Sequence, residues 1–126
     1  FDAVINVESS HLYPQFPRFL DEVTRVLRPG GHFLYADLRY GETIPVWEEQ
    51  LQDAEMSMIS CMAINEQVMR GMEKNAHWWV RMVDRLVPAF LRRWLVVRGY
   101  IFVWNAFRDM QRGGAADYRM YCFVKE

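Results

Sequence analysis

Cysteine is scarce in this sequence, and no long apolar run is present. The two cysteines, Cys61 and Cys122, lie far apart and form no CxxC or other metal-ligand spacing. This favours a reducing, cytoplasmic environment and predicts no metal site. No apolar stretch approaches the roughly 20 residues of a membrane-spanning helix, and no signal peptide is visible.

Net charge is also small. Fifteen Lys and Arg residues against 16 Asp and Glu give a formal net charge of −1, which argues against a protein that binds nucleic acid by neutralising phosphates. The 126 residues fit one domain at most, and the 52% of hydrophobic residues are enough for a core. The sequence begins Phe1-Asp2-Ala3-Val4, without an initiator Met and already inside an apparent strand. We therefore expect a fragment of a longer domain.

The first 42 residues predict a strand, a helix and a strand. The β-branched run Ala3–Val7 is typical of a buried parallel strand. Apolar residues then recur at helical spacing from Pro17, and Pro29-Gly30-Gly31 ends the helix. His32 to Ala36 reads as a second strand that ends at Asp37. Short links between these elements predict a right-handed, parallel βαβ unit.

Residues 43–95 predict a helical insertion rich in Met and Trp. Thr43 is placed to cap one helix, and a further helix is expected from Asn75 through Val87, with Pro88 interrupting it.

Residues 96–126 predict the closing strands of a sheet. Val96 to Trp104 and Tyr118 to Val124 are strand-like, and Asn105 to Arg112 suggests a short helix between them.

The polar loop after the first strand, NVESSHLYPQFPRF, carries Glu8 and His11. Ligands of open α/β sheets bind beyond the carboxyl ends of strands. Adjacent strands lie about 4.8 Å apart, so His11 is expected to reach Asp37. On these residues alone, a packing role for His11 is the commoner explanation. Ser9 and Ser10 are predicted to form the turn rather than to act as nucleophiles, because no G-x-S-x-G nucleophile elbow surrounds them.

A family resemblance rests on three motifs in order. FDAVINVESS, a helix ending LRPGG, and FLYADL resemble the second half of a class I S-adenosylmethionine-dependent methyltransferase. YADLR, INEQVMRG, VDRLVPAFLR and YRMYCFVKE resemble a narrower group, the phthiotriol/phenolphthiotriol dimycocerosates methyltransferases of mycobacteria.

The resemblance implies an α/β fold, the C-terminal part of a Rossmann-like methyltransferase sheet, with strands four to seven and the last strand antiparallel. Residues 1–126 then form a partial domain from which the N-terminal cofactor-binding half, with its glycine-rich turn, is absent. The implied cofactor is S-adenosyl-L-methionine, with Asn6, Val7 and Glu8 on the cofactor side. His11 is implied as the catalytic base and Asp37 as the residue that orients it.

The Met- and Trp-rich insertion is a candidate lid over a bulky lipid alcohol, although ordinary packing over the sheet is the alternative. The predicted substrate-binding residues are Tyr13, Trp47, Met58, Met62, Trp78 and Trp79. Five arginines suggest peripheral contact with an anionic membrane, against the simpler explanation of a solvated face: Arg70, Arg81, Arg85, Arg92 and Arg93.

The expected function is O-methylation of a hydroxyl on a long-chain lipid, such as a phthiotriol. Two alternatives stay open: an inactive truncated remnant, and a small-molecule O-methyltransferase. The expected partners are a lipid substrate and the absent N-terminal half of the domain, with no nucleic acid.

Overall fold

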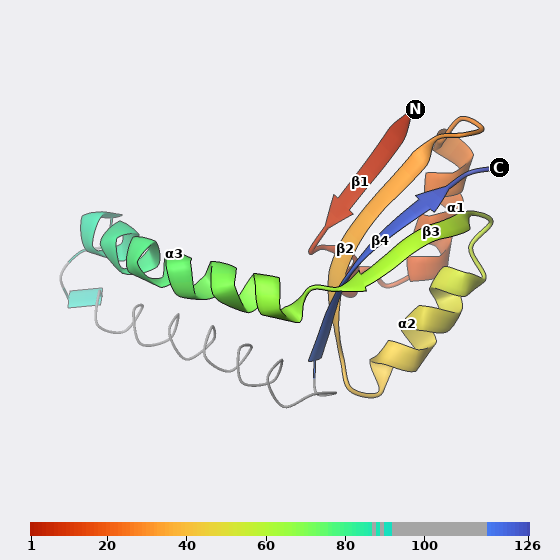
Figure 1. The fold of residues 1–126 in the computed structure, drawn as a ribbon. Helices are drawn as coiled ribbons and strands as arrows, with labels where there is room; N and C mark the ends of the chain where they lie inside the picture. Colours follow the sequence, from red (N-terminus) through yellow and green to blue (C-terminus); the bar gives the residue numbers. More distant parts are fainter. Residues whose placement is uncertain (87, 89, 92–115) are drawn as a thin grey trace.

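The computed structural model describes residues 1–86, 88, 90–91 and 116–126, which build one four-stranded sheet (Figure 1). The strand order is β1-β2-β4-β3. The strands are β1 (Ala3–Val7), β2 (His32–Tyr40), β3 (Ser57–Ala63) and β4 (Ala116–Val124). β1 and β2 are parallel, and β4 runs antiparallel to both β2 and β3. The predicted α/β class with an antiparallel last strand is therefore confirmed.

The first half folds as its local signals predict. Helix α1 (Phe16–Val26) carries a proline in its first turn and is followed by Gly30, whose φ of +75° suits glycine. A Cβ on Gly31 would lie 2.9 Å from the carbonyl oxygen of Arg28, so this position has no room for a side chain. These two glycines turn the chain sharply from α1 into β2.

Strand β2 is longer than predicted. The sequence places its end at Asp37, but the strand continues to Tyr40. β1 pairs with β2 only as far as Ala36, whereas β4 pairs with it from His32 to Tyr40. The prediction was wrong here because the partner that extends the strand comes from the far end of the chain.

The second half departs further from prediction. Helix α2 (Thr43–Gln52) forms, but Thr43 does not cap it: its hydroxyl donates instead to the carbonyl of Tyr40 at 2.7 Å. The segment predicted as a helical insertion contains strand β3, and helix α3 (Asn65–Leu86) begins at Asn65 rather than Asn75. The side-chain oxygen of Asn65 accepts a hydrogen bond from the backbone of Tyr118 in β4. Pairing with β4 thus fixes both β3 and the start of α3.

Helices α1 and α2 cover one face of the sheet. The core between them contains side chains of both helices and of β2 and β4, together with Leu27 just after α1 and Met56 just before β3: Phe16, Leu20, Val23, Leu27, Phe33, Tyr35, Trp47, Leu51, Met56, Tyr121 and Phe123. Burying each large apolar side chain stabilises the fold by about 1.5–3 kcal/mol. The first turns of α3 pack on the opposite face, against Ala116 and Tyr118, before the helix extends away from the sheet (Figure 1).

Most of that opposite face stays uncovered in the described part of the chain. The pairing registers place Ile5, Leu34, Met120 and Met62 on it, and these side chains are 68%, 41%, 44% and 50% exposed. Such a row of exposed apolar side chains on a sheet is typical of an interaction surface.

The predicted strand Val96 to Trp104 and helix Asn105 to Arg112 lie outside the described residues, as do Arg92 and Arg93. No helix in the described ranges is both long and apolar enough to cross a bilayer.

Candidate active site

The loop after β1 carries His11 over the neighbouring strand. Glu8 adopts a left-handed backbone conformation, with φ of 51°, and its amide donates to the carbonyl of Ala36 at 2.8 Å. This turn reverses the chain directly after β1 and leads into a short 3-10 helix, η1 (Ser10–Leu12). Ser10 is buried by the turn, whereas His11 stays at the surface.

His11 and Asp37 form the pair that the sequence predicts. Nδ1 of His11 lies 2.9 Å from Oδ1 of Asp37, and the backbone amide of His11 donates to Oδ2 at 3.0 Å. The amide of Leu38 donates to Oδ1 at 2.8 Å. Asp37 is fully buried, while the His11 side chain is 35% exposed. The predicted proximity is confirmed; the catalytic roles stay a prediction.

Ser10 lies at the centre of a buried hydrogen-bond network. Its hydroxyl is 2.5 Å from Oδ2 of Asp37 and 2.6 Å from the hydroxyl of Tyr35, and it accepts from Arg39 at 2.9 Å. The indole nitrogen of Trp47 donates to Tyr35 at 3.0 Å. Three elements, η1, β2 and α2, thus meet through one set of polar side chains.

Arg39 is the only cation buried in this network among the described residues. Nη1 of Arg39 lies 3.2 Å from Oδ2 of Asp37. Its guanidinium stacks over the ring of Phe16 at 5.3 Å and that of Trp47 at 4.9 Å. A buried ion pair is stable only when further hydrogen bonds satisfy both ions, and both ions have them here.

The network keeps Asp37 ionised. Burial raises the pKa of Asp37, but the hydrogen bonds from Ser10 and His11, the Leu38 amide and the charge of Arg39 outweigh it, so the pKa lies below its ordinary value. An ionised carboxylate only accepts hydrogen bonds. Nδ1 of His11 therefore donates in this arrangement, and in the neutral form of the ring Nε2 presents a lone pair.

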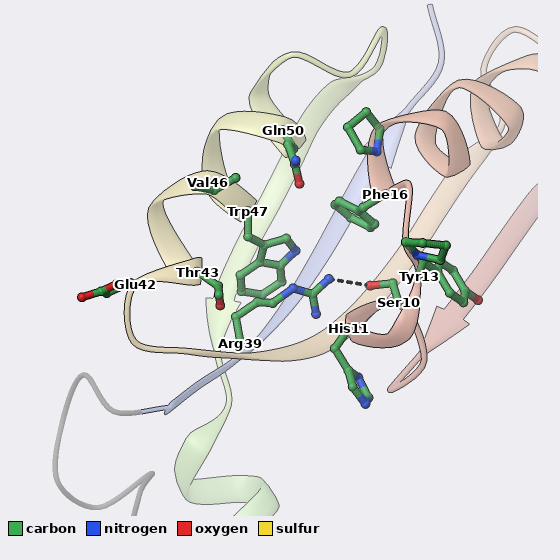
Figure 2. A pocket seen from close by; sticks show the side chains of 12 residues that line it. Ser10, His11, Tyr13, Phe16, Arg39, Glu42, Thr43, Val46, Trp47 and Gln50 are labelled. Carbon is green, nitrogen blue, oxygen red and sulfur yellow. Dashed lines mark hydrogen bonds between the residues drawn. The ribbon is translucent and has the colours of Figure 1, made fainter.

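A pocket of about 480 Å³ opens between the η1 loop and α2 (Figure 2). Its lining combines aromatic rings, prolines and a valine with an equal number of polar or charged side chains: Ser10, His11, Tyr13, Pro14, Phe16, Pro17, Arg39, Glu42, Thr43, Val46, Trp47 and Gln50. A concave site that combines aromatic surface with placed polar groups is typical of small-molecule binding.

Three predicted site residues meet at this pocket: His11, Tyr13 and Trp47. Met58 and Met62 lie on β3 and Trp78 on α3, and none of these lines the pocket. The side chain of Trp79 lies outside the described part of the structure.

The three predicted cofactor residues lie together at the carboxyl end of β1. The side-chain nitrogen Nδ2 of Asn6 donates to the hydroxyl of Tyr13 at 3.0 Å. Val7 is 58% exposed, and Glu8 is also exposed. The pKa of the Tyr118 hydroxyl is raised to about 12, first by burial and then by the negative charge of Glu8. The Glu8 carboxylate therefore lies near Tyr118 of β4.

Sequence reasoning missed Ser10, Tyr35 and Arg39 as site residues. The signal was present in β2, where Tyr35, Asp37 and Arg39 alternate and so share one face. That face also carries the buried Phe33, which indicates that all of them point into the α1 and α2 side. Ser10 gave no signal, because its partners come from strand β2, far along the chain.

A protein-family model described as a methyltransferase domain matches residues 1–35. The chain is 54% identical over 125 residues to a fatty-acid O-methyltransferase of Mycolicibacterium smegmatis, a match that covers 99% of this chain and 44% of that protein. It is 48% identical over 130 residues to phthiotriol/phenolphthiotriol dimycocerosates methyltransferase 1 of Mycobacterium ulcerans, covering 100% of this chain and 45% of that protein. The chain thus spans less than half the length of these relatives.

Solved structures share the fold. The cyclopropane synthase MmaA2 of Mycobacterium tuberculosis superimposes with a TM-score of 0.79 at 11% identity, over 98% of this chain and 55% of that one. A phosphoethanolamine N-methyltransferase 2 of Haemonchus contortus, in complex with phosphomonomethylethanolamine and S-adenosylhomocysteine, superimposes with a TM-score of 0.78 at 12% identity. This match covers 99% of this chain and 33% of that one. Over nearly its whole length the chain is therefore similar in sequence to the C-terminal part of mycobacterial lipid methyltransferases, and its fold is that of the Rossmann-like S-adenosylmethionine-dependent methyltransferases.

Proposed function

We propose that this chain provides the acceptor side of an O-methyltransferase that methylates a hydroxyl of a long-chain lipid. The observation that carries the proposal is the His11–Asp37 pair, 2.9 Å apart beside an open pocket whose walls combine aromatic and polar side chains. Asp37 is buried and held by further donors, whereas the His11 side chain is partly exposed and lines the pocket. This is the arrangement that a general base requires.

His11 would accept the proton of the acceptor hydroxyl. An alcohol oxygen is a poor nucleophile until its proton begins to leave, and a histidine with a free ring nitrogen is suited to take that proton near neutral pH. Nε2 of His11 is available for this, since Asp37 engages Nδ1. The carboxylate of Asp37 would then stabilise the imidazolium that forms. Such base catalysis typically contributes about 10²–10⁴-fold to the rate.

The residues present fit the methyl donor. S-Adenosylmethionine supplies a methyl group bonded to a positively charged sulfur. Glu8 offers an exposed carboxylate for the cationic or hydroxyl groups of such a molecule, and the adjacent Val7 offers exposed apolar surface. Asn6 lies at the same end of β1, and its side chain forms a hydrogen bond with the hydroxyl of Tyr13. These residues would hold the donor on the side of β1, next to the base.

The pocket walls support an apolar acceptor. Tyr13, Phe16, Val46 and Trp47 surround the space next to His11 with aromatic and aliphatic surface. Met58, Met62 and Trp78 do not line this pocket, and Met62 lies on the opposite, uncovered face of the sheet.

A second acceptor is favoured by one comparison. The relative that is 54% identical is named a fatty-acid O-methyltransferase, and the carboxylate of a fatty acid is already ionised at neutral pH. Methylation of a carboxylate needs no base. In that case the loss of the His11 imidazole would reduce activity on alcohols far more than on fatty acids.

Activity would require further polypeptide. The chain spans 44–45% of the relatives described above, and one face of its sheet exposes the apolar side chains of Ile5, Leu34 and Met120. We propose that the rest of a longer methyltransferase packs on this face, next to the edge strand β1. A chain without that part would be the inactive remnant.

A chimera tests the proposal. The 126-residue chain replaces the matching segment of the Mycolicibacterium smegmatis enzyme, and transfer of labelled methyl groups is measured with a long-chain alcohol, a fatty acid and a small alcohol. Methylation of the long-chain alcohol supports the proposal. Methylation of the fatty acid alone would establish the second acceptor, and a chimera that folds and binds the cofactor but methylates nothing would contradict both.

A further inference from the structure

We propose that Ser10 is a positioning residue: its hydroxyl, directed by Arg39 and Tyr35, turns the Asp37 carboxylate so that Oδ1 faces the imidazole of His11. This rests on the proposed function of His11 as the base. Ser10 itself is 1% exposed, so solvent does not compete for its hydrogen bonds.

The two oxygens of Asp37 have different partners. Oδ1 accepts from Nδ1 of His11 at 2.9 Å and from the amide of Leu38 at 2.8 Å. Oδ2 accepts from the hydroxyl of Ser10 at 2.5 Å and from the amide of His11 at 3.0 Å, and Arg39 lies at 3.2 Å. Rotation about the last torsion of an aspartate is soft and roughly two-fold. Hydrogen bonds therefore decide which way this carboxylate faces.

Donor-only groups fix the direction of the hydroxyl protons. The Trp47 indole can only donate, so the oxygen of Tyr35 accepts from it at 3.0 Å and is free to donate to Ser10. Arg39 also only donates, and its Nη2 lies 2.9 Å from the Ser10 oxygen (Figure 2). With both neighbours donating to it, the single proton of Ser10 points at Oδ2 of Asp37. The shortest contact of this carboxylate is thereby assigned to Ser10.

This hydrogen-bond chain begins at the pocket wall. Trp47 and Arg39 line the pocket and also supply the two donor-only groups. The wall and the His11–Asp37 pair thus form one unit, in which removal of the Ser10 hydroxyl leaves Oδ2 without its closest donor. The carboxylate then keeps the His11 and Leu38 amides and Arg39 but is less constrained, so Oδ1 is directed less firmly at Nδ1 of His11.

The ring nitrogens of His11 provide a direct readout. Nitrogen-15 NMR of the 126-residue chain distinguishes the two tautomers, and a His11→Gln variant assigns the signal among the three histidines. In the unmodified chain we expect the proton on Nδ1. In Ser10→Ala the fraction with the proton on Nε2 rises severalfold, and Tyr35→Phe shows an intermediate effect. Ser9→Ala is the matched control, because the Ser9 hydroxyl bonds only Asn6 and Tyr13 among the described residues, and it leaves the spectrum unchanged.

Kinetics of the chimera separate positioning from binding and from folding. Groups that orient metal-ligating histidines are typically worth about 10–100-fold, and we expect Ser10→Ala, which acts through Asp37, to lower kcat by a factor of this order with KM unchanged. If Ser10→Ala does not fold, Ser10→Cys, a weaker donor, carries the same test. A folded Ser10 variant with the original tautomer and kcat would overturn the inference while leaving His11 as the base. Loss of activity through KM alone would assign Ser10 to binding and overturn it equally.

Discussion

Oδ1 of Asp37 lies 2.9 Å from Nδ1 of His11, although the two residues are 26 positions apart in the sequence. The contact exists because β1 and β2 are parallel neighbours, so the loop that follows β1 passes over the far part of β2. It places a buried, ionised carboxylate behind an imidazole that lines a pocket. The expectations below follow from this arrangement.

Asp37→Asn is expected to lower the free energy of unfolding by about 3–5 kcal/mol, because it leaves the buried Arg39 without its counter-ion. The pKa of Asp37 lies below its ordinary value. Its contribution is therefore complete above about pH 4 and is lost as the pH falls through the folded-state pKa. Urea unfolding followed by tryptophan fluorescence measures both effects. Asp21→Asn, on the exposed side of α1, is the control and should change stability by less than about 0.5 kcal/mol.

Stability should also fall in alkali because of Tyr35. Burial raises the pKa of Tyr35 to about 12, while the unfolded chain ionises near pH 10. The unfolded state therefore loses its proton first, and the free energy of unfolding decreases as the pH rises from about 10 to about 12. Tyr35→Phe should reduce this slope by up to about 1.4 kcal/mol per pH unit. An unchanged slope in the variant would show that Tyr35 does not titrate in this way.

Replacement of glycine by alanine should change stability in opposite directions at two positions. Gly31→Ala places a Cβ 2.9 Å from the carbonyl oxygen of Arg28, and such overpacking typically costs about 1–3 kcal/mol. Gly71 lies within α3, and a Cβ there would meet no atom within 4 Å in the described part of the chain beyond the helix's own backbone, so Gly71→Ala should stabilise the helix by up to about 1 kcal/mol. Thermal unfolding of the two variants checks the pair. A change in melting temperature of the same sign in both variants would contradict the geometry.

A charge placed on the uncovered sheet face should affect stability differently in the chain alone and in the chimera. In the chain alone, Leu34 is 41% exposed, and Leu34→Glu is expected to change stability by less than about 1 kcal/mol. In the chimera the same change would bury an unpaired carboxylate and cost at least about 3 kcal/mol. Melting temperatures of both proteins, each with and without the substitution, provide the comparison. Equal effects would show that nothing packs on this face.

Local signals predicted the first part of the fold well. The run Ala3–Val7 has few alternatives to a strand, and Pro29-Gly30-Gly31 ends α1 through backbone geometry that does not depend on the rest of the chain. The prediction that β2 ends at Asp37 was wrong, because the continuation of the strand to Tyr40 depends on pairing with β4. Strand β3 was missed for the same reason, since β4 is its only strand partner in the described part of the sheet.

The site was predictable in part. His11 and Asp37 follow from strand ends and a family motif, so their contact was expected. Ser10 was predicted to be a turn former, yet its hydroxyl bonds Tyr35, Asp37 and Arg39. No local pattern reports such partners, because they are brought together only when η1 folds onto β2.

The role of His11 is tested most directly by turnover of the chimera. His11→Ala should lower kcat on a long-chain alcohol by about 10²–10⁴-fold while cofactor binding stays unchanged. The control His32→Ala, an exposed histidine at the start of β2, should keep full activity. A His11→Ala chimera that binds the cofactor and turns over the alcohol at the original rate would show that His11 is not the base.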